Sequence, residues 1–260
     1  MGDQRENKVF LKTLANGLGI ITLFNDRNPS MTLNELTKKS CLHRATVYRI
    51  VLTLEQLGYI SREGKAFKLN PSTLNLGYSY LSSLPFFNIA HDLLHDLNKR
   101  IGLATSITVL DGEDVVYVSR IHAKRILSIS LDIGSRLPAY ATSTGHVLIS
   151  GLRQEQIETY LTRSKRERIT KKTLTERDDL KNSFKKTREK GYCVSEGWLN
   201  DGLISIAIPI KNSMGKTICA MNVVGNIFET SKSKLIKEIL PQMEKTREKL
   251  QSFISAHNFS

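Results

Sequence analysis

The chain has 260 residues, of which 40% are hydrophobic and 24% charged, with a formal net charge of +13. This composition excludes a disordered or fibrous protein, and the length suits two ordinary domains. No apolar run reaches the ~20 residues that span a bilayer, and the polar start with Asp3 and Glu6 is unlike a signal peptide. The basic balance favours a polyanionic partner. Three scattered cysteines, Cys41, Cys193 and Cys219, favour a cytoplasmic protein without a disulfide framework.

The first predicted helix covers residues 9–24. Phe10, Leu14, Leu18 and Ile21 share one helical face, which we expect to pack on a later helix. The loop at 25–30, with Asp26 and Pro29 among its residues, ends this element.

A helix-turn-helix is predicted at residues 32–57. Thr32 and Glu35 fit a capping box at the start of a short helix. The second helix begins near Leu42 and ends before Gly58, a typical C-terminal stop. Its apolar stripe recurs at three- and four-residue spacing through Val47, Ile50, Val51, Leu54 and Leu57.

The hairpin signal after Gly58 predicts a wing. Residues 59–62 and 66–69 read as strands around the polar turn Glu63-Gly64-Lys65. In a winged helix-turn-helix the first turns of the second helix contact base edges. The predicted DNA-binding residues are therefore His43, Arg44, Ala45, Thr46, Tyr48 and Arg49 on the helix, and Arg62 and Lys65 on the wing. The alternative is a small helical domain with a solvated basic face.

The rest of the chain predicts a linker helix and a second domain. Asn70 and Pro71 fit a helix start, and Pro85 ends the linker. We expect domains at 1–70 and 85–260, joined by a linker at 71–84. The second domain alternates strands with helices, which indicates an α+β fold with a mostly antiparallel sheet. The expected strands are 104–110, 115–120, 126–131, 192–195, 204–210 and 217–224; the expected helices are 86–101, 145–152, 154–163, 176–190 and 233–255.

Residues 140–146 gather hydroxyls beside a predicted helix start. Ser143, Thr144 and Gly145 lie where backbone N–H groups and the helix dipole attract a small anion, and Tyr140 adds an aromatic wall. Plain N-capping by a hydroxyl explains the same residues equally well. Nucleophilic catalysis would need a base held beside the hydroxyl and a third group to orient it, and neither is evident. We therefore expect a binding site and no enzyme.

Two histidines, His91 and His95, are four residues apart on a predicted helix. This spacing partly matches a zinc-binding pattern in which the intervening acid is a glutamate. Here the intervening acid is Asp92, which is shorter, and no third ligand is evident. A solvated helix face is the preferred interpretation, so we expect neither a metal nor a cofactor.

Both halves of the chain resemble the IclR family of bacterial transcriptional regulators. The resemblance rests on residues 32–36, 42–49 and 54–59, and more specifically on 134–148, 188–192, 202–210 and 220–223. These segments are most similar to the subgroup that controls catabolism of protocatechuate and related aromatic acids. The resemblance implies a winged helix-turn-helix, a linker helix and a GAF-like effector-binding domain. It also implies a homodimer, or a dimer of dimers, on a palindromic double-stranded operator.

The resemblance further implies a small-molecule pocket between the 140–145 loop and the sheet. Carried over by position, its polar residues are Ser143, Thr144, Glu196, Ser205 and Asn222. We expect the carboxylate of an aromatic acid at the Ser143–Gly145 end, with its ring facing Tyr140, Met221 and Trp198. Relatives often have an acid where this chain has Trp198. Either Glu196 takes over the role of that acid, or the pocket is more apolar and accepts an aromatic group. The alternative function is a small-molecule-binding protein or enzyme that uses the C-terminal domain.

Overall fold

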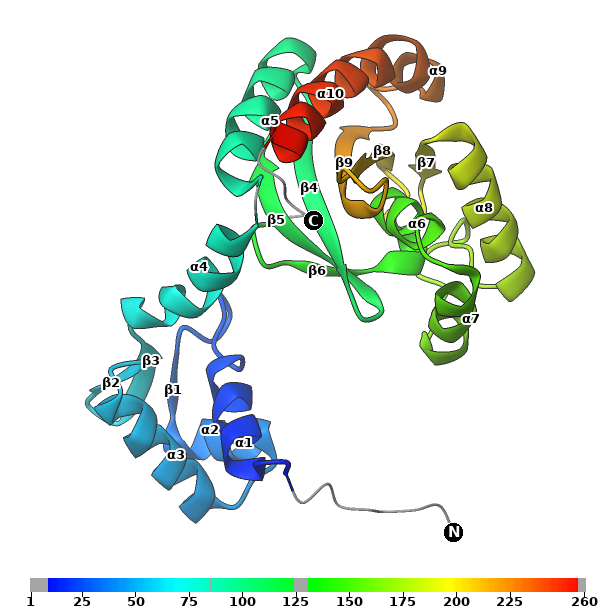
Figure 1. Ribbon diagram of the computed structural model, residues 1–260. Helices are drawn as coiled ribbons and strands as arrows, with labels where there is room; N and C mark the ends of the chain where they lie inside the picture. The colour runs from blue at the N-terminus through cyan, green and yellow to red at the C-terminus, as the bar shows by residue number, and fades with distance from the viewer. Residues whose placement is uncertain (1–8, 85, 124–130, 257–260) are drawn as a thin grey trace. The chain divides into compact units, whose positions relative to one another are not determined.

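A computed structural model describes residues 9–84, 86–123 and 131–256. The chain divides into two compact units, Met1–Tyr80 and Leu81–Ser260, which we describe separately (Figure 1). None of the helices in the described ranges has the length and hydropathy of a membrane-spanning segment.

The N-terminal unit is a winged helix-turn-helix, as the sequence predicted. Three helices pack beside a small antiparallel sheet with the strand order β1-β3-β2. The helices are α1 (Lys12–Ile21), α2 (Leu33–Ser40) and α3 (Arg44–Gln56); the strands are β1 (Ser30–Thr32), β2 (Ile60–Glu63) and β3 (Ala66–Leu69). The short β1 pairs with the wing and was not predicted, because three residues carry too little alternation to indicate a strand.

Local signals set the ends of these helices. The predicted capping box is present, since the Thr32 hydroxyl accepts from the Glu35 N–H and the Glu35 carboxylate accepts from the Thr32 N–H at 2.7 Å. Cys41 adopts a left-handed conformation (φ 55°) and ends α2. Gly58 does the same after α3 (φ 78°), which confirms its role as the helix stop.

The packing of α1 differs from the prediction. Ile20 is the one buried residue of this helix, whereas Phe10, Leu14 and Leu18 are 50–63% exposed. The helix starts only at Lys12, so Phe10 precedes it. Leu14 and Leu18 instead border an open apolar groove between α1 and α3.

The C-terminal unit is built on a six-stranded antiparallel sheet with the order β6-β5-β4-β9-β8-β7. It follows a 3-10 turn (Pro71–Thr73) and the helix α4 (Leu74–Ser83), where the linker helix was expected. The strands are β4 (Ala104–Asp111), β5 (Asp114–Ile121), β6 (Arg136–Pro138), β7 (Cys193–Glu196), β8 (Leu203–Lys211) and β9 (Thr217–Asn226). Most of the strand expected at 126–131 lies outside the described residues. The edge strand β6 was not among the expected strands.

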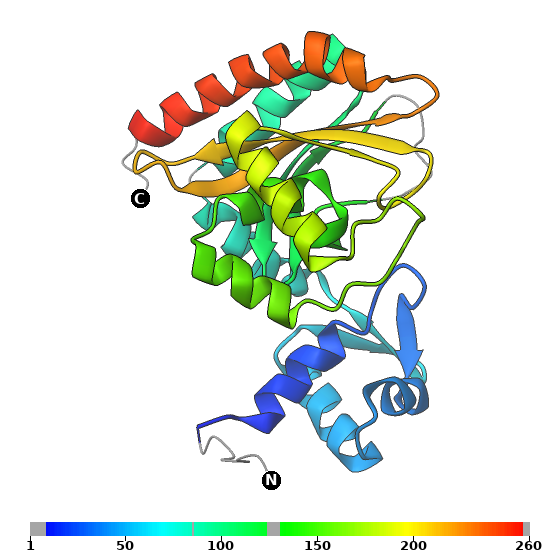
Figure 2. The ribbon, with the colours of Figure 1, turned by 90° about the vertical axis from the view of Figure 1, so that its right-hand side faces the viewer.

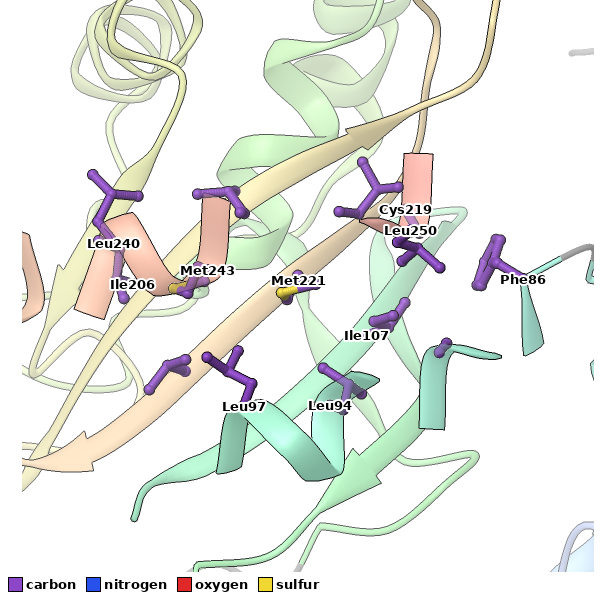
Figure 3. Packing of buried hydrophobic residues seen from close by; sticks show 14 of the residues in the cluster. Phe86, Leu94, Leu97, Ile107, Ile206, Cys219, Met221, Leu240, Met243 and Leu250 are labelled. Carbon is purple, nitrogen blue, oxygen red and sulfur yellow. The ribbon is translucent and has the colours of Figure 1, made fainter. Parts of the chain in front are cut away.

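Helices cover both faces of this sheet (Figures 1 and 2). One face carries α5 (Phe87–Ile101) and α10 (Leu240–Ala256), which follows a short helix α9 (Lys232–Lys234) and a π-helical turn. The other carries α6 (Ser143–Ser150), α7 (Gln154–Arg163) and α8 (Arg177–Lys190). Figure 3 shows the first core, in which Leu94 and Leu97 of α5 face Met221 of β9 and Met243 of α10. The α+β fold is thus confirmed.

Candidate functional sites: a basic groove and a buried polar cavity

The first candidate site is a groove between the start of α3 and the wing. It brings together four predicted DNA-binding residues, Arg44, Tyr48, Arg62 and Lys65, with Thr32, Leu33, Asn34 and Phe67. The Arg44 guanidinium donates to the Asn34 side-chain oxygen. Arg62 donates to the Gly64 carbonyl at 3.0 Å and lies 5.8 Å above the Phe67 ring. Two arginines are therefore held in place beside an exposed lysine, without an acidic residue among the described lining residues.

The other predicted DNA-binding residues lie at the edges of this groove or on another side of α3. His43 is the N-cap residue of α3, and Ala45 is exposed in its first turn. Thr46 and Arg49 line the apolar groove that α3 forms with α1. Tyr48 and Arg49 thus point in different directions, as adjacent residues on a helix do.

The second candidate site is a cavity under α6, on the face of the large sheet opposite α5. Its empty volume, including the opening to solvent, is about 550 Å³. The described lining residues are Tyr117, Arg120, Leu131, Leu137, Ala141, Thr142, Ser143, Thr144, Ser195, Trp198, Leu199, Leu203, Ser205, Asn222 and Val224. Apolar walls with a few convergent polar groups are typical of small-molecule sites.

Four of the predicted effector-binding residues line this cavity: Ser143, Thr144, Ser205 and Asn222. The hydroxyls of Ser143 and Ser205 are hydrogen-bonded at 2.8 Å, and the Asn222 amide donates to Ser205 at 3.4 Å. The Asn222 side-chain oxygen is buried and has no partner among the described residues. A polar network from three elements therefore retains an open acceptor that a ligand can use.

Tyr140 and Gly145 do not line the cavity; they pack next to the residues that do. The Tyr140 hydroxyl accepts from the Glu167 N–H and donates to the Glu167 carbonyl, both at 2.9 Å. A Cβ on Gly145 would lie 2.0 Å from the Ala139 carbonyl oxygen, so glycine allows α6 to approach this backbone. The predicted aromatic wall of Tyr140 is absent, because its ring packs in the second core.

His146, one residue further, is fully buried and also structural. Its Nε2 lies 2.8 Å from the Tyr140 carbonyl and its Nδ1 2.8 Å from the Ser183 hydroxyl. A carbonyl only accepts, so Nε2 carries the proton and Ser183 donates to Nδ1. Burial lowers the pKa of His146 to about 4, and the ring stays neutral.

Strand alternation explains why Glu196 and Met221 do not reach the cavity. Neighbouring residues on a strand point to opposite faces. Asn222 and Ser195 face the cavity, so Met221 packs among α5 and α10 in the first core. Glu196 is half-exposed and forms an ion pair with Lys172 at 3.3 Å. The structure thus contradicts the placement of both residues in the pocket, and Ser195 lines it instead.

Arg120 and Tyr117 line the cavity and were missed in the sequence. Simple alternation along β5 would place residues 117 and 120 on opposite faces. The pairing with β4 contains a bulge, so that Thr108 faces Tyr117, Ile107 faces Ser119 and Ser106 faces Arg120. This extra residue shifts the alternation and turns both side chains to the cavity. Arg120 lies 5.2 Å from the centre of the Tyr117 ring.

Trp198 forms another wall of the cavity. Its ring packs on His146, with the ring centres 4.5 Å apart. Two hydrogen bonds from the segment before α8 fix the loop that carries Trp198. Thr170 donates to the Gly197 carbonyl and Thr173 donates to the Trp198 carbonyl, both at 2.6 Å. The tryptophan therefore gives the cavity a fixed, flat apolar surface.

Comparisons with known proteins match both units of the chain. The family model of the IclR helix-turn-helix domain matches residues 13–64, and that of the C-terminal region of bacterial transcriptional regulators of the IclR type matches residues 78–252. A Pca regulon regulatory protein from Pseudomonas putida is 33% identical over 233 residues, which cover 89% of this chain and 80% of that protein.

Two solved structures are also similar. A protein from Rhodococcus sp. RHA1, described as a transcriptional regulator, superposes with a TM-score of 0.86 at 37% identity, covering 96% of this chain and 100% of the other. The inducer-binding domain of a PobR double mutant from Acinetobacter, in complex with 3-hydroxybenzoic acid, has a TM-score of 0.60 at 32% identity. It covers 63% of this chain and 96% of that domain. On the winged helix-turn-helix, the helix-covered sheet and these matches, the chain belongs to the IclR family of bacterial transcriptional regulators.

Proposed function

We propose that this regulator binds operator DNA through the groove between α3 and the wing, and that an aromatic carboxylate in the cavity under α6 controls this binding. The observation that carries the proposal is the cavity itself. It combines a flat apolar wall at Trp198 with a hydrogen-bonding network at Ser143, Ser205 and Asn222. The unpartnered Asn222 oxygen belongs to a residue that lines this cavity, where a ligand can donate a hydrogen bond to it.

The choice of an aromatic acid is supported by the similar proteins. One is named for the Pca regulon, and another was solved with 3-hydroxybenzoic acid. Leu137, Leu199 and Leu203 line the cavity here and suit the faces of a benzene ring. Of the predicted effector contacts we keep Ser143, Thr144, Ser205 and Asn222.

For the DNA site we propose Arg44 and Tyr48 as contacts to base edges, with Arg62 and Lys65 on the phosphates. His43, Ala45, Thr46 and Arg49 flank them. Arginine at a guanine edge and lysine at a phosphate are the usual pairings of such modules. The arrangement suits a cytoplasmic protein that acts on double-stranded DNA.

We also propose that the working form is a homodimer or a dimer of dimers. Leu14, Leu18 and Leu57 are at least half exposed around the α1–α3 groove, and Leu74 and Tyr78 on α4 are 74% and 64% exposed. Apolar residues gathered in this way mark interaction surfaces. A two-fold pair would match half-sites ~34–36 Å apart, or multiples of that spacing.

The DNA part is tested with the full chain. A binding site is first selected from a pool of random duplexes, and its affinity is then measured over a range of salt concentrations. Arg44→Ala should cost about 1–3 kcal/mol of discrimination between base pairs. Lys65→Ala should weaken all sequences alike and lower the salt slope by about 1. Lys249→Ala, an exposed lysine of α10, is the matched control and should change neither value.

The ligand part is tested by thermal shift and by operator binding with 4-hydroxybenzoate and protocatechuate. A ligand at 100 times its dissociation constant should stabilise the fold by about 2.7 kcal/mol. Absence of any shift with these acids, or ligand binding that leaves operator affinity unchanged, would refute the proposal. Turnover of the ligand would favour an enzyme instead.

A further inference from the structure

The cavity contains one charged residue among its described lining residues, Arg120. Its side chain is buried, with 8% of the residue exposed. One guanidinium nitrogen, Nη1, donates to the Ser106 hydroxyl at 3.4 Å, and the group lies over the Tyr117 ring. The Nε–H is buried and has no hydrogen-bond partner among the described residues. This guanidinium is therefore only partly satisfied.

Among the described residues, no carboxylate lies within ion-pair distance of Arg120. Asp114 on β5 pairs with Arg136, and Asp132 pairs with His122. Residues 124–130, which the structure does not describe, contain neither Asp nor Glu in their sequence. Burying a cation without a counterion is unfavourable by several kcal/mol. Such a group persists where a bound anion completes it.

We infer that Arg120 binds the carboxylate of the ligand and so determines its specificity. The inference rests on the proposed function and changes the orientation that the sequence predicted, which placed the anion at the start of α6. That helix end offers a partial charge, and its Gly145 N–H is already bonded to the Thr142 hydroxyl at 3.0 Å. Arginine instead carries a full charge and a fork of donors that matches a carboxylate.

The other end of the cavity then selects the rest of the ligand. Ser205 on β8 lies three strands across the sheet from Arg120 on β5 and two residues further along it, so their backbones are separated by about 16 Å. Hydroxyls at Ser143 and Ser205 and the open Asn222 oxygen suit a neutral hydroxyl on the ligand. They offer no cation to a second carboxylate. The ligand class is thus a monocarboxylate with a hydroxyl across an aromatic ring.

The test compares 4-hydroxybenzoate with its neutral amide, 4-hydroxybenzamide, by calorimetry on the full-length protein. The wild type should prefer the acid by at least ~10-fold. Arg120→Gln should weaken binding of the acid by ~30-fold or more, the equivalent of 2 kcal/mol lost from a buried charge pair. It should leave affinity for the amide within ~3-fold. Arg120→Lys keeps a positive charge and should retain part of the preference. Terephthalate, with a second carboxylate, should bind the wild type at least ~10-fold more weakly than 4-hydroxybenzoate.

Two further measurements separate binding from folding. In the absence of ligand, each variant should bind operator DNA with the affinity of the wild type, which shows that the variant is folded. Arg120→Met should raise the melting temperature of the ligand-free protein, because it removes an unpaired buried charge; a structural arginine would lower it.

If Ser143→Asp abolishes binding of the acid while Arg120→Gln keeps the preference for acid over amide, the anion lies at α6 and this inference is overturned. If no variant, including the wild type, binds an aromatic acid, the proposed ligand class fails as well. A wild type that binds acid and amide equally also overturns the role of Arg120.

Discussion

Replacing Gly145 with alanine tests the link between backbone packing and the cavity. The added Cβ would lie 2.0 Å from the Ala139 carbonyl oxygen and 2.5 Å from its carbon, and neither backbone atom can rotate away. The start of α6 must therefore move. Overpacking of this kind costs about 1–3 kcal/mol, and weakening of the Thr142 cap adds about 1 kcal/mol. We expect a loss of about 2–4 kcal/mol, which lowers the melting temperature of the C-terminal unit by about 4–15 °C.

The assay is differential scanning calorimetry of the full chain, and the matched control is Gly19→Ala. Gly19 lies within α1, and a Cβ there meets nothing within 4 Å. That change should be neutral or stabilise the N-terminal unit by up to about 1 kcal/mol, since alanine is the better helix former. A Gly145→Ala protein that melts within 1 °C of the wild type would show that α6 can shift without cost, against this reasoning.

The remaining predictions concern a buried histidine, an apolar groove and a helix anchor. Because the pKa of His146 is about 4 when folded and ~6.5 when unfolded, the unfolded state binds the proton first. Stability should therefore fall by about 1.4 kcal/mol per unit as pH drops from 6.5 to 4, and denaturation of His146→Gln should show a flatter profile. Leu18→Ser should raise the dissociation constant of the proposed dimer in light scattering; an unchanged mass at low micromolar concentration contradicts the interface. Ile20→Ala should cost about 2–5 kcal/mol in urea denaturation, whereas Leu14→Ala, at an exposed position, should cost under 1 kcal/mol in the monomer.

Elements with strong local signals were predictable from the sequence. The capping box at Thr32 and Glu35 and the stop at Gly58 fixed the helix-turn-helix, because these signals act within one turn of helix. Both long hairpins of the large sheet formed where the alternation and the turns indicated. Such features depend on neighbours in the chain, which a sequence displays directly.

The lining of the cavity depended on tertiary pairing and was predicted only in part. Met221 and Asn222 are adjacent on β9, so only one of them could face the ligand. Pairing with β4 decides which of the two faces the cavity, because Asn222 lies opposite Ser106 and Met221 opposite Ile107 of the first core. Arg120 was missed because the bulge in β5 cannot be read from periodicity. The signal that was present is an arginine at the end of a strand that begins with four largely apolar residues, 115–118.

The bulge between β4 and β5 also has a consequence for any effort to change what this protein senses. Before the bulge, cavity-facing positions fall on odd numbers such as 117; after it they fall on even numbers such as 120. A mutagenesis library designed on uninterrupted alternation would vary Ser119, which pairs with Ile107 on the face that contacts α5, and would damage the core. A library at 117, 120 and 222 instead varies the ligand surface alone. Deleting one residue of the bulge would leave Tyr117 and Arg120 two positions apart on a regular strand, so both side chains would still face the cavity.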